Sequence, residues 1–83
     1  MQQRAVGVVA IIVKKRTAAA PEVNRVLTEF GEIILGRMGL PSTDRDLHII
    51  TLIVDATTDE IGSLTGKLGM IPEVTVKSTL AKM

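Results

Sequence analysis

The segment from Ala5 to Val13 is the feature that most restricts how this chain can fold. It reads AVGVVAIIV, so it is apolar throughout and rich in β-branched residues, a composition that favours a β-strand. An apolar strand without polar alternation is typical of the centre of a sheet that is covered on both sides. A chain of 83 residues has little material to build two such covers. We therefore expect one cover to come from outside the chain.

A basic residue ahead of an apolar run also raises the alternative of a secretory signal. Here Arg4 precedes the run, but the run continues into Lys14, Lys15 and Arg16 with no small-residue cleavage site directly after it. The run is also far shorter than the roughly 20 residues that a membrane-spanning helix needs. We predict a strand of a cytoplasmic protein that does not contact a membrane.

The middle of the chain predicts a helix followed by a second strand. Pro21 suits the first turn of a helix, and Gly31 is suited to stop it. Residues 33–38 are predicted as a strand, and residues 39–44 as a turn, because glycine, proline, serine and aspartate cluster there. The helix shows a core-facing stripe at helical spacing, made of Val23, Val26, Leu27 and Phe30.

The last part of the chain predicts a strand, a helix and a strand. Residues 47–56 form a long apolar segment that is predicted as a strand. Thr57 and Glu60 have the spacing of a capping box, which predicts the start of a helix. Pro72 is predicted to end that helix, and residues 74–77 alternate as a final strand. The core stripe of the second helix is Ile61, Leu64, Leu68 and Ile71.

The resulting order, βαββαβ, predicts an α+β fold of the ferredoxin-like type, over residues 1–83 as one domain. Right-handed crossovers place both helices on one face of a four-stranded antiparallel sheet. The other face then has no cover of its own. We expect a homo-oligomer, a dimer or a tetramer, to cover it.

Composition excludes several classes of function. The chain has no cysteine and one histidine, and its formal net charge is +1 with both signs interspersed. Asp44, Asp46 and His48 are spaced as a metal site in extended chain would be, but a solvated turn explains them better because no second histidine completes the ligand set. We predict no enzyme activity, no catalytic residue, no metal or other cofactor, and no direct binding of nucleic acid.

The segment GRMGLP is the main candidate for a binding site. Arg37 interrupts an apolar strand between Gly36 and Met38, and Gly39 follows. A guanidinium at this place can bind an anionic ligand or pair with an acid of a neighbouring chain. The alternative, an arginine at the rim of a subunit contact, stays open. We predict Gly36, Arg37, Met38 and Gly39 as ligand- or partner-binding residues.

Three segments resemble the family of iron-only hydrogenase system regulators: RAVGVVAIIV, EVNRVLTEFGEIILGRMGLP and IVDATTDEIGSLTGKLG. That family is similar to ACT domains and to the C-terminal domain of the nickel-responsive repressor NikR. The resemblance implies an ACT-like regulatory module that senses a small molecule or binds a protein of the hydrogenase system. A structural or assembly protein without a small-molecule effector is the alternative.

Two residue-level comparisons follow from the resemblance. The stretch that corresponds to the nickel motif of NikR retains Asp55 alone among the ligands, so no nickel site is expected. ACT domains bind effectors near the loop after the first strand. The corresponding residues here are Lys14, Lys15 and Arg16, which the resemblance therefore implies as further ligand- or partner-binding candidates.

Overall fold

The computed structural model describes residues 3–81, except for the side chains of Arg16, Thr17 and Thr43. It confirms the predicted βαββαβ order, with two short 3-10 helices added beside β2. The elements in chain order are β1 (Ala5–Lys14), α1 (Arg16–Glu29), η1 (Gly31–Ile33), β2 (Ile34–Ser42), η2 (Thr43–Arg45), β3 (Leu47–Ala56), α2 (Thr58–Gly69) and β4 (Val74–Leu80).

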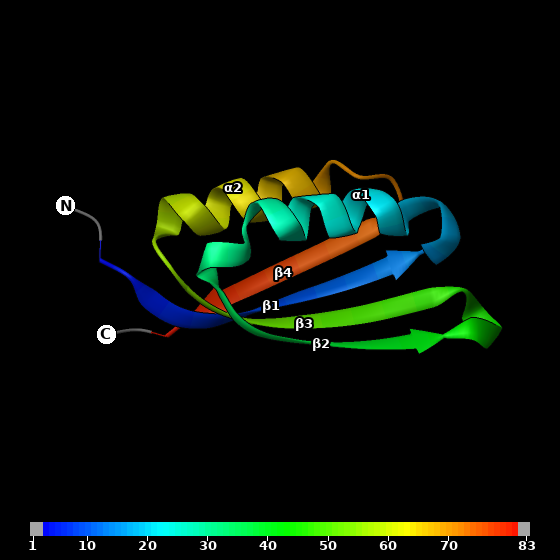
Figure 1. The fold of residues 1–83 in the computed structure, drawn as a ribbon, viewed down its shortest axis with the longest axis horizontal. Coiled ribbons are helices and arrows are strands. Elements are labelled where there is room, and N and C mark those ends of the chain that lie inside the picture. Colours follow the sequence, from blue (N-terminus) through cyan, green and yellow to red (C-terminus); the bar gives the residue numbers. More distant parts are fainter. Residues whose placement is uncertain (1–2, 82–83) are drawn as a thin grey trace.

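The four strands form one antiparallel sheet in the order β2-β3-β1-β4. Both helices lie in one layer on the same side of this sheet (Figure 1). The ferredoxin-like arrangement predicted from the sequence is therefore confirmed. β1 and β3 are the central strands, and they pair over their whole length from Ala5 opposite Ala56 to Lys14 opposite Leu47.

The core lies between the helices and the sheet. Every second residue of β1 and β3 points into it, and no polar or charged residue in the described part of the chain is buried there. Both predicted helix stripes contribute, with Phe30 only partly buried. The most deeply buried large side chains are Ile11, Ile50, Leu52, Leu64 and Leu68, together with Val9, Val13, Val23, Val26 and Val54.

The first helix begins earlier than the sequence predicts. It starts at Arg16, which places Pro21 inside the helix and not in its first turn. Lys15 adopts a left-handed conformation with φ of 51°, so the chain turns directly from β1 into α1. The alanines before Pro21 are strong helix formers, and Ala19 is buried against the core. Propensity and packing together outweigh the hydrogen bond that Pro21 cannot donate.

The second strand is longer than predicted. It runs from Ile34 to Ser42, so Gly39, Leu40 and Pro41 belong to the strand and not to a turn. β2 lies at the edge of the sheet, where a proline is tolerated because one side of the strand has no partner to receive an N–H. The turn occupies η2 and Asp46, whose φ is 51°.

The second helix begins at the predicted capping box. The backbone N–H of Thr57 donates to Glu60 Oε1 at 2.9 Å, and the N–H of Glu60 donates to Thr57 Oγ1 at 3.1 Å. Arg4 pairs with the same Glu60 carboxylate at 3.0 Å. The hydrogen bond from Thr57, with the charge of Arg4, holds the pKa of Glu60 below its ordinary value. α2 ends at Gly69, three residues before the predicted Pro72.

Candidate binding surfaces

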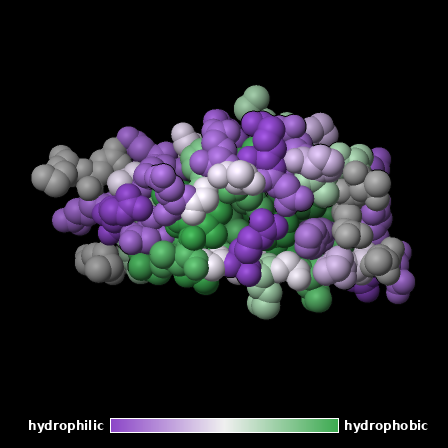
Figure 2. All heavy atoms as spheres, in the orientation of Figure 1, coloured by the Kyte–Doolittle hydropathy of each residue, from purple (hydrophilic) through white to green (hydrophobic). Residues whose placement is uncertain are grey.

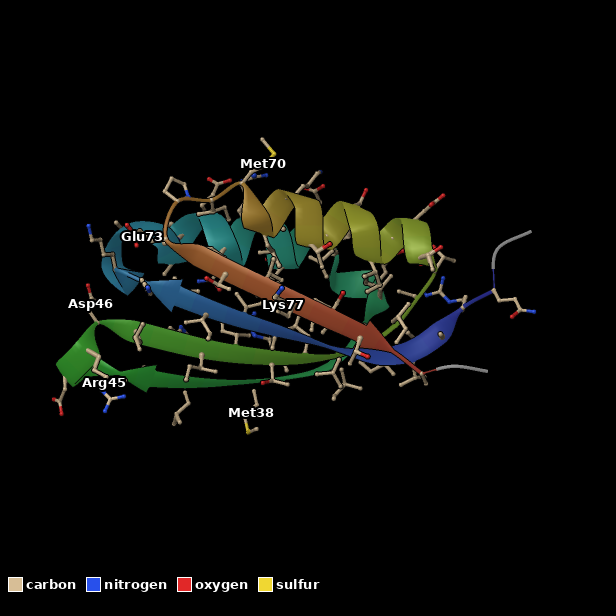
Figure 3. All side chains as sticks on the ribbon, turned by 180° about the vertical axis from the view of Figure 1, so that it is seen from behind. Met38, Arg45, Asp46, Met70, Glu73 and Lys77 are labelled. Atoms are coloured by element: carbon tan, nitrogen blue, oxygen red, sulfur yellow. The ribbon has the colours of Figure 1, made fainter. Side chains whose placement is uncertain are left out.

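The face of the sheet opposite the helices is apolar and uncovered in the isolated chain. We call it the open face. Figure 3 shows Met38 pointing away from the helix layer on this side, and Figure 2 shows hydrophobic residues along the border where the sheet lies. Met38 is 72% exposed and Leu40 is 68% exposed. The register adds to the same face the half-exposed Val6, Val8, Ile12, Ile49 and Ile53.

The alternation of β1 explains why its sequence is apolar on both sides. Val9, Ile11 and Val13 point to the helices and are at most 1% exposed. Val8 and Ile12 point the other way and are 37% and 39% exposed. We predicted that β1 is covered on both sides, and this chain's own helices cover one of them. The second side stays open among the described residues.

The candidate residues of β2 do not form one cluster. Gly36 and Met38 pair with Ile53 and Thr51 and share the open face with them. Arg37 pairs with Leu52, whose side chain is in the core, so Arg37 lies on the helix side of the sheet. Because side chains alternate along a strand, Gly39 lies on the side of Arg37. A ligand that contacts Arg37 therefore approaches from the helix side, at the sheet edge.

Arg37 is exposed at this edge and reaches α1. Its Nη2 donates to Oδ1 of Asn24 at 3.4 Å, a long hydrogen bond. No ion pair of Arg37 with an acid occurs among residues 3–81. The other N–H groups of the guanidinium can donate hydrogen bonds to a planar anion such as a carboxylate.

The two glycines of this segment differ in their surroundings. A Cβ added to Gly39 would lie 2.7 Å from Nε2 of His48, so the histidine ring occupies the space beside Gly39. Nothing lies within 4 Å of a Cβ added to Gly36. Gly39 thus makes room for a neighbour within the chain, whereas Gly36 leaves open space on the apolar face.

The basic segment after β1 lies where β1 and β2 both end, because Lys14 pairs with Leu47 and Leu47 pairs with Ser42. Lys14 points to the open face opposite Leu47, and Lys15 turns to the helix side, where its Nζ is 3.8 Å from Oε1 of Glu73. The backbone of Arg16 opens α1, but its side chain is outside the described residues. Lys14 and Lys15 therefore do not lie on one face of the sheet.

A groove between the helices was not predicted from the sequence. It holds about 650 Å³ and lies between the first half of α1 and the end of α2 with the loop to β4. Its apolar lining comes from Ala18, Ala19, Met70, Ile71 and Pro72, and its charged lining from Lys15, Glu22, Arg25, Lys67 and Glu73. The lining residues of α1 and those of α2 and its following loop lie some 50 positions apart in the chain, so no local sequence pattern signals their meeting.

A chain of ion pairs borders this groove. Arg25 Nε donates to Glu22 Oε1 at 2.7 Å, and Arg25 Nη1 lies 3.6 Å from Glu29. Lys67 of α2 pairs with Glu29 and lies 5.5 Å from the centre of the Phe30 ring. The hydrogen bond from Lys67 lowers the pKa of Glu29, and the one to Glu22 raises the pKa of Arg25. These contacts tie the two helices together.

A metal centre has no candidate in the part of the chain that the structure describes. There, no three His, Cys, Asp or Glu residues gather as metal ligands would. Asp44 lies in η2 and Asp46 in the turn, while His48 is in β3 beside Gly39. Within residues 3–81, no helix has the length and apolar character to cross a membrane.

The fold is ferredoxin-like and of the ACT type. The chain resembles the ACT domain of GTP pyrophosphokinase from Chlorobium tepidum, with a TM-score of 0.78, 18% identity, and coverage of 93% of this chain and 100% of that one. It also resembles SnoaB, a cofactor-independent oxygenase from Streptomyces nogalater, with a TM-score of 0.56, 14% identity, and coverage of 98% and 93%. At these identities the likeness concerns the fold alone.

The chain belongs to the TM1266-like family, which is described as "Iron-only hydrogenase system regulator, putative" and matches residues 5–78. The uncharacterized protein TM1266 from Thermotoga maritima is 38% identical, with a TM-score of 0.92, and the match covers 96% of this chain and 100% of that one. No curated protein sequence matches the chain. The family resemblance stated from the sequence is confirmed.

Proposed function

We propose that this protein is a cytoplasmic regulator of the iron-only hydrogenase system that acts as a homo-oligomer. In this proposal all 83 residues form one regulatory module, and a second copy covers the open face. The family description supports the role, and the ACT-like fold supports a regulatory module. In this proposal the protein regulates the system by binding a small effector or a protein of the hydrogenase system.

The exposed apolar side chains of the open face are the main observation that supports a homo-oligomer. It holds seven large aliphatic or methionine side chains from β1, β2 and β3, each between 37% and 72% exposed: Val6, Val8, Ile12, Met38, Leu40, Ile49 and Ile53. Fully burying one such side chain contributes roughly 1.5–3 kcal/mol, so leaving all of them in water is unfavourable. The central pair Ala10 and Thr51 is small and lies between the larger pairs. A second sheet can therefore approach closely.

Replacing one open-face residue by a charge tests this contact. We expect Ile12→Glu to convert the protein to a monomer in sedimentation equilibrium, because the carboxylate would have to be buried unpaired. Ser63→Glu, on the exposed side of α2, is the matched control and should associate like the parent protein. A parent protein that is monomeric at micromolar concentration contradicts the proposal.

The regulatory role needs a test in cells. Deleting the gene in the source organism should change iron-only hydrogenase activity, and complementation with the parent protein should restore it. Hydrogenase transcript measured in the same strains separates control of expression from control of assembly. Unchanged activity and transcript after deletion would remove the proposed role. The Ile12→Glu variant should fail to complement if the oligomer is the working form.

The edge of β2 and the start of α1 are the proposed contacts for an effector or partner. Arg37 at the sheet edge carries spare donors, Gly36 and Met38 border the open face, and Gly39 completes the segment. Lys14, Lys15 and Arg16 add three basic residues at the end of β1 and the start of α1, whereas Gly36 to Gly39 lie level with the middle of β1 through their pairing with β3. The two groups lie apart, so they are two candidate contacts and not one site.

A further inference from the structure

We propose that the groove between α1 and the end of α2 binds a small amphiphilic carboxylate. The apolar body of this ligand lies along α1, and its carboxylate lies at Lys15. This carboxylate is the ligand of the effector contact proposed above at the start of α1, and its regulatory meaning rests on the proposed function. The groove is distinct from the open face, so binding itself does not depend on a second copy covering the sheet.

The groove exists because α1 carries alanines where it faces the end of α2. Ala18 and Ala19 have no side chain that could fill the space beside Ile71 and Pro72. From Lys15 to Arg25 the groove follows about 15 Å of helix, at a rise of roughly 1.5 Å per residue. Its volume of about 650 Å³ is in the range of small-molecule sites.

The apolar lining favours a hydrocarbon or ring as the body of the ligand. Met70 is 84% exposed at the edge of the groove, the most exposed of the large apolar side chains described. Figure 3 shows Met70 and Glu73 at the end of α2 and in the loop that leads to β4. A methionine side chain adapts its shape to an apolar partner at small cost, and binding would withdraw it from water.

The charges of the groove favour an anion at one end. Three cations and two acids line it, Lys15, Arg25 and Lys67 against Glu22 and Glu73. Arg25 and Lys67 are engaged by Glu22 and Glu29 in the chain of ion pairs. Lys15 is 72% exposed in its side chain and has only a loose contact of 3.8 Å with Glu73. It is therefore the cation that a ligand carboxylate can reach.

The backbone at this end supports the same assignment. Lys15 is the N-cap residue of α1 and makes no side-chain capping hydrogen bond, and the first turn of α1 holds no acid, so the positive end of the helix is not neutralised by its own residues. Glu73, with φ of 71°, is held beside Lys15 by the hydrogen bond from Lys14 N–H to its carbonyl oxygen at 2.8 Å. A bound carboxylate would compete with the Glu73 carboxylate for Lys15.

Octanoate is the probe that tests the proposal, with octanamide as its uncharged match. In ¹H–¹⁵N correlation spectra of the parent protein at pH 7, we expect octanoate to shift the amides of Ala18, Ala19, Met70 and Ile71 in a saturable way. Octanamide should bind about threefold more weakly, which is the effect of one exposed ion pair. Shifts confined to open-face amides such as Ile12 and Ile53, or no saturation, would overturn the proposal.

Three variants and one control test the apolar part of the groove separately from the charged end at Lys15. Ala18→Leu fills the groove from an exposed position and should abolish binding, whereas Ser63→Leu, on α2 away from the groove, should bind like the parent. Lys15→Gln should lower octanoate affinity to that of octanamide, and Glu73→Gln should raise it about twofold because a competing acid is removed. Unchanged affinity in both charge variants would overturn the carboxylate assignment.

Discussion

The two faces of the sheet are built from alternate residues of the same strands, yet they have different physical roles. Toward the helices, Val9, Ile11 and Leu52 are fully buried. Toward the other side, Ile12 and Ile53 are about two-fifths exposed although they are equally apolar. The covered face stabilises the folded chain, whereas the open face offers a contact that the described chain does not itself make. Hydropathy alone does not distinguish these roles, because both faces use the same residue types.

The largest expected difference is between adjacent residues of β3. Leu52→Ala should lower the free energy of unfolding by about 2–5 kcal/mol, because a cavity opens in a packed core. Ile53→Ala, on the open face, should cost less than about 1 kcal/mol at low protein concentration. Urea unfolding of both variants measures the two values.

Protein concentration sharpens this comparison. A second copy on the open face stabilises the folded state by mass action, so the penalty of Ile53→Ala should grow with protein concentration. The loss of stability caused by Leu52→Ala should not depend on protein concentration, because Leu52 packs inside the chain's own core. If the loss of stability caused by Ile53→Ala is the same at all protein concentrations, the open face remains in water.

Two glycines provide a second contrast. A Cβ on Gly7 would lie 2.4 Å from the carbonyl oxygen of Thr79, whereas a Cβ on Gly36 would meet nothing within 4 Å. Gly7→Ala should therefore destabilise the protein by about 1–3 kcal/mol through the pairing of β1 with β4. Gly36→Ala should change stability by less than about 0.5 kcal/mol. Thermal unfolding followed by circular dichroism tests both, and a tolerated Gly7→Ala would mean that β4 shifts easily.

Arg37 tests whether the edge of the covered face is a contact surface. Arg37→Ala removes the hydrogen bond to Asn24 and should lower stability by less than about 1 kcal/mol, since the bond is long and exposed. Arg37→Lys keeps the charge and loses the planar fork. If Arg37 meets an acid of a partner, both variants should weaken association in sedimentation experiments, the alanine more. Parent-like association in both would make Arg37 a solvated edge residue.

The smallest expected effect is the pH dependence from the capping box. The pKa of Glu60 is lowered from 4.5 because its carboxylate accepts the Thr57 N–H and faces Arg4. The folded state therefore binds this proton less readily than the unfolded state does, and the related stability is present above pH 4.5 and is lost as the pH falls through the lowered pKa. Glu60→Gln keeps a capping-box residue and should flatten this acid limb in unfolding curves.

The sequence predicted the elements well where the signal is local. The capping box of Thr57 and Glu60, the limits of β3 and the core stripes follow from spacing within a few residues, and the structure reproduces them. The βαββαβ order and the handedness of its crossovers then restrict the topology to a few arrangements, of which the ferredoxin-like one is observed. The open face also follows from this step, because two helices on one side leave the other side uncovered.

The errors lie where distant segments decide the local structure. β2 continues through Gly39 and Pro41 because β3 offers a pairing register as far as Ser42, which outweighs the turn propensity of those residues. α1 begins before Pro21 because β1 ends against it without a loop. Of the candidate site residues, alternation along β2 sends Met38 and Arg37 to opposite faces, and that separation requires the register to be known.

Local spacing thus determined which helices and strands form, their order along the chain, and that β1 is apolar on both faces. These features depend on hydrogen bonds and periodicities within one segment. The tertiary structure decided which residues meet across segments. It placed Lys15 beside Glu73 and left a groove over Ala18 and Ala19. Such meetings depend on packing between elements that are far apart in the chain, and the free energy of that packing is not encoded in any single stretch of sequence.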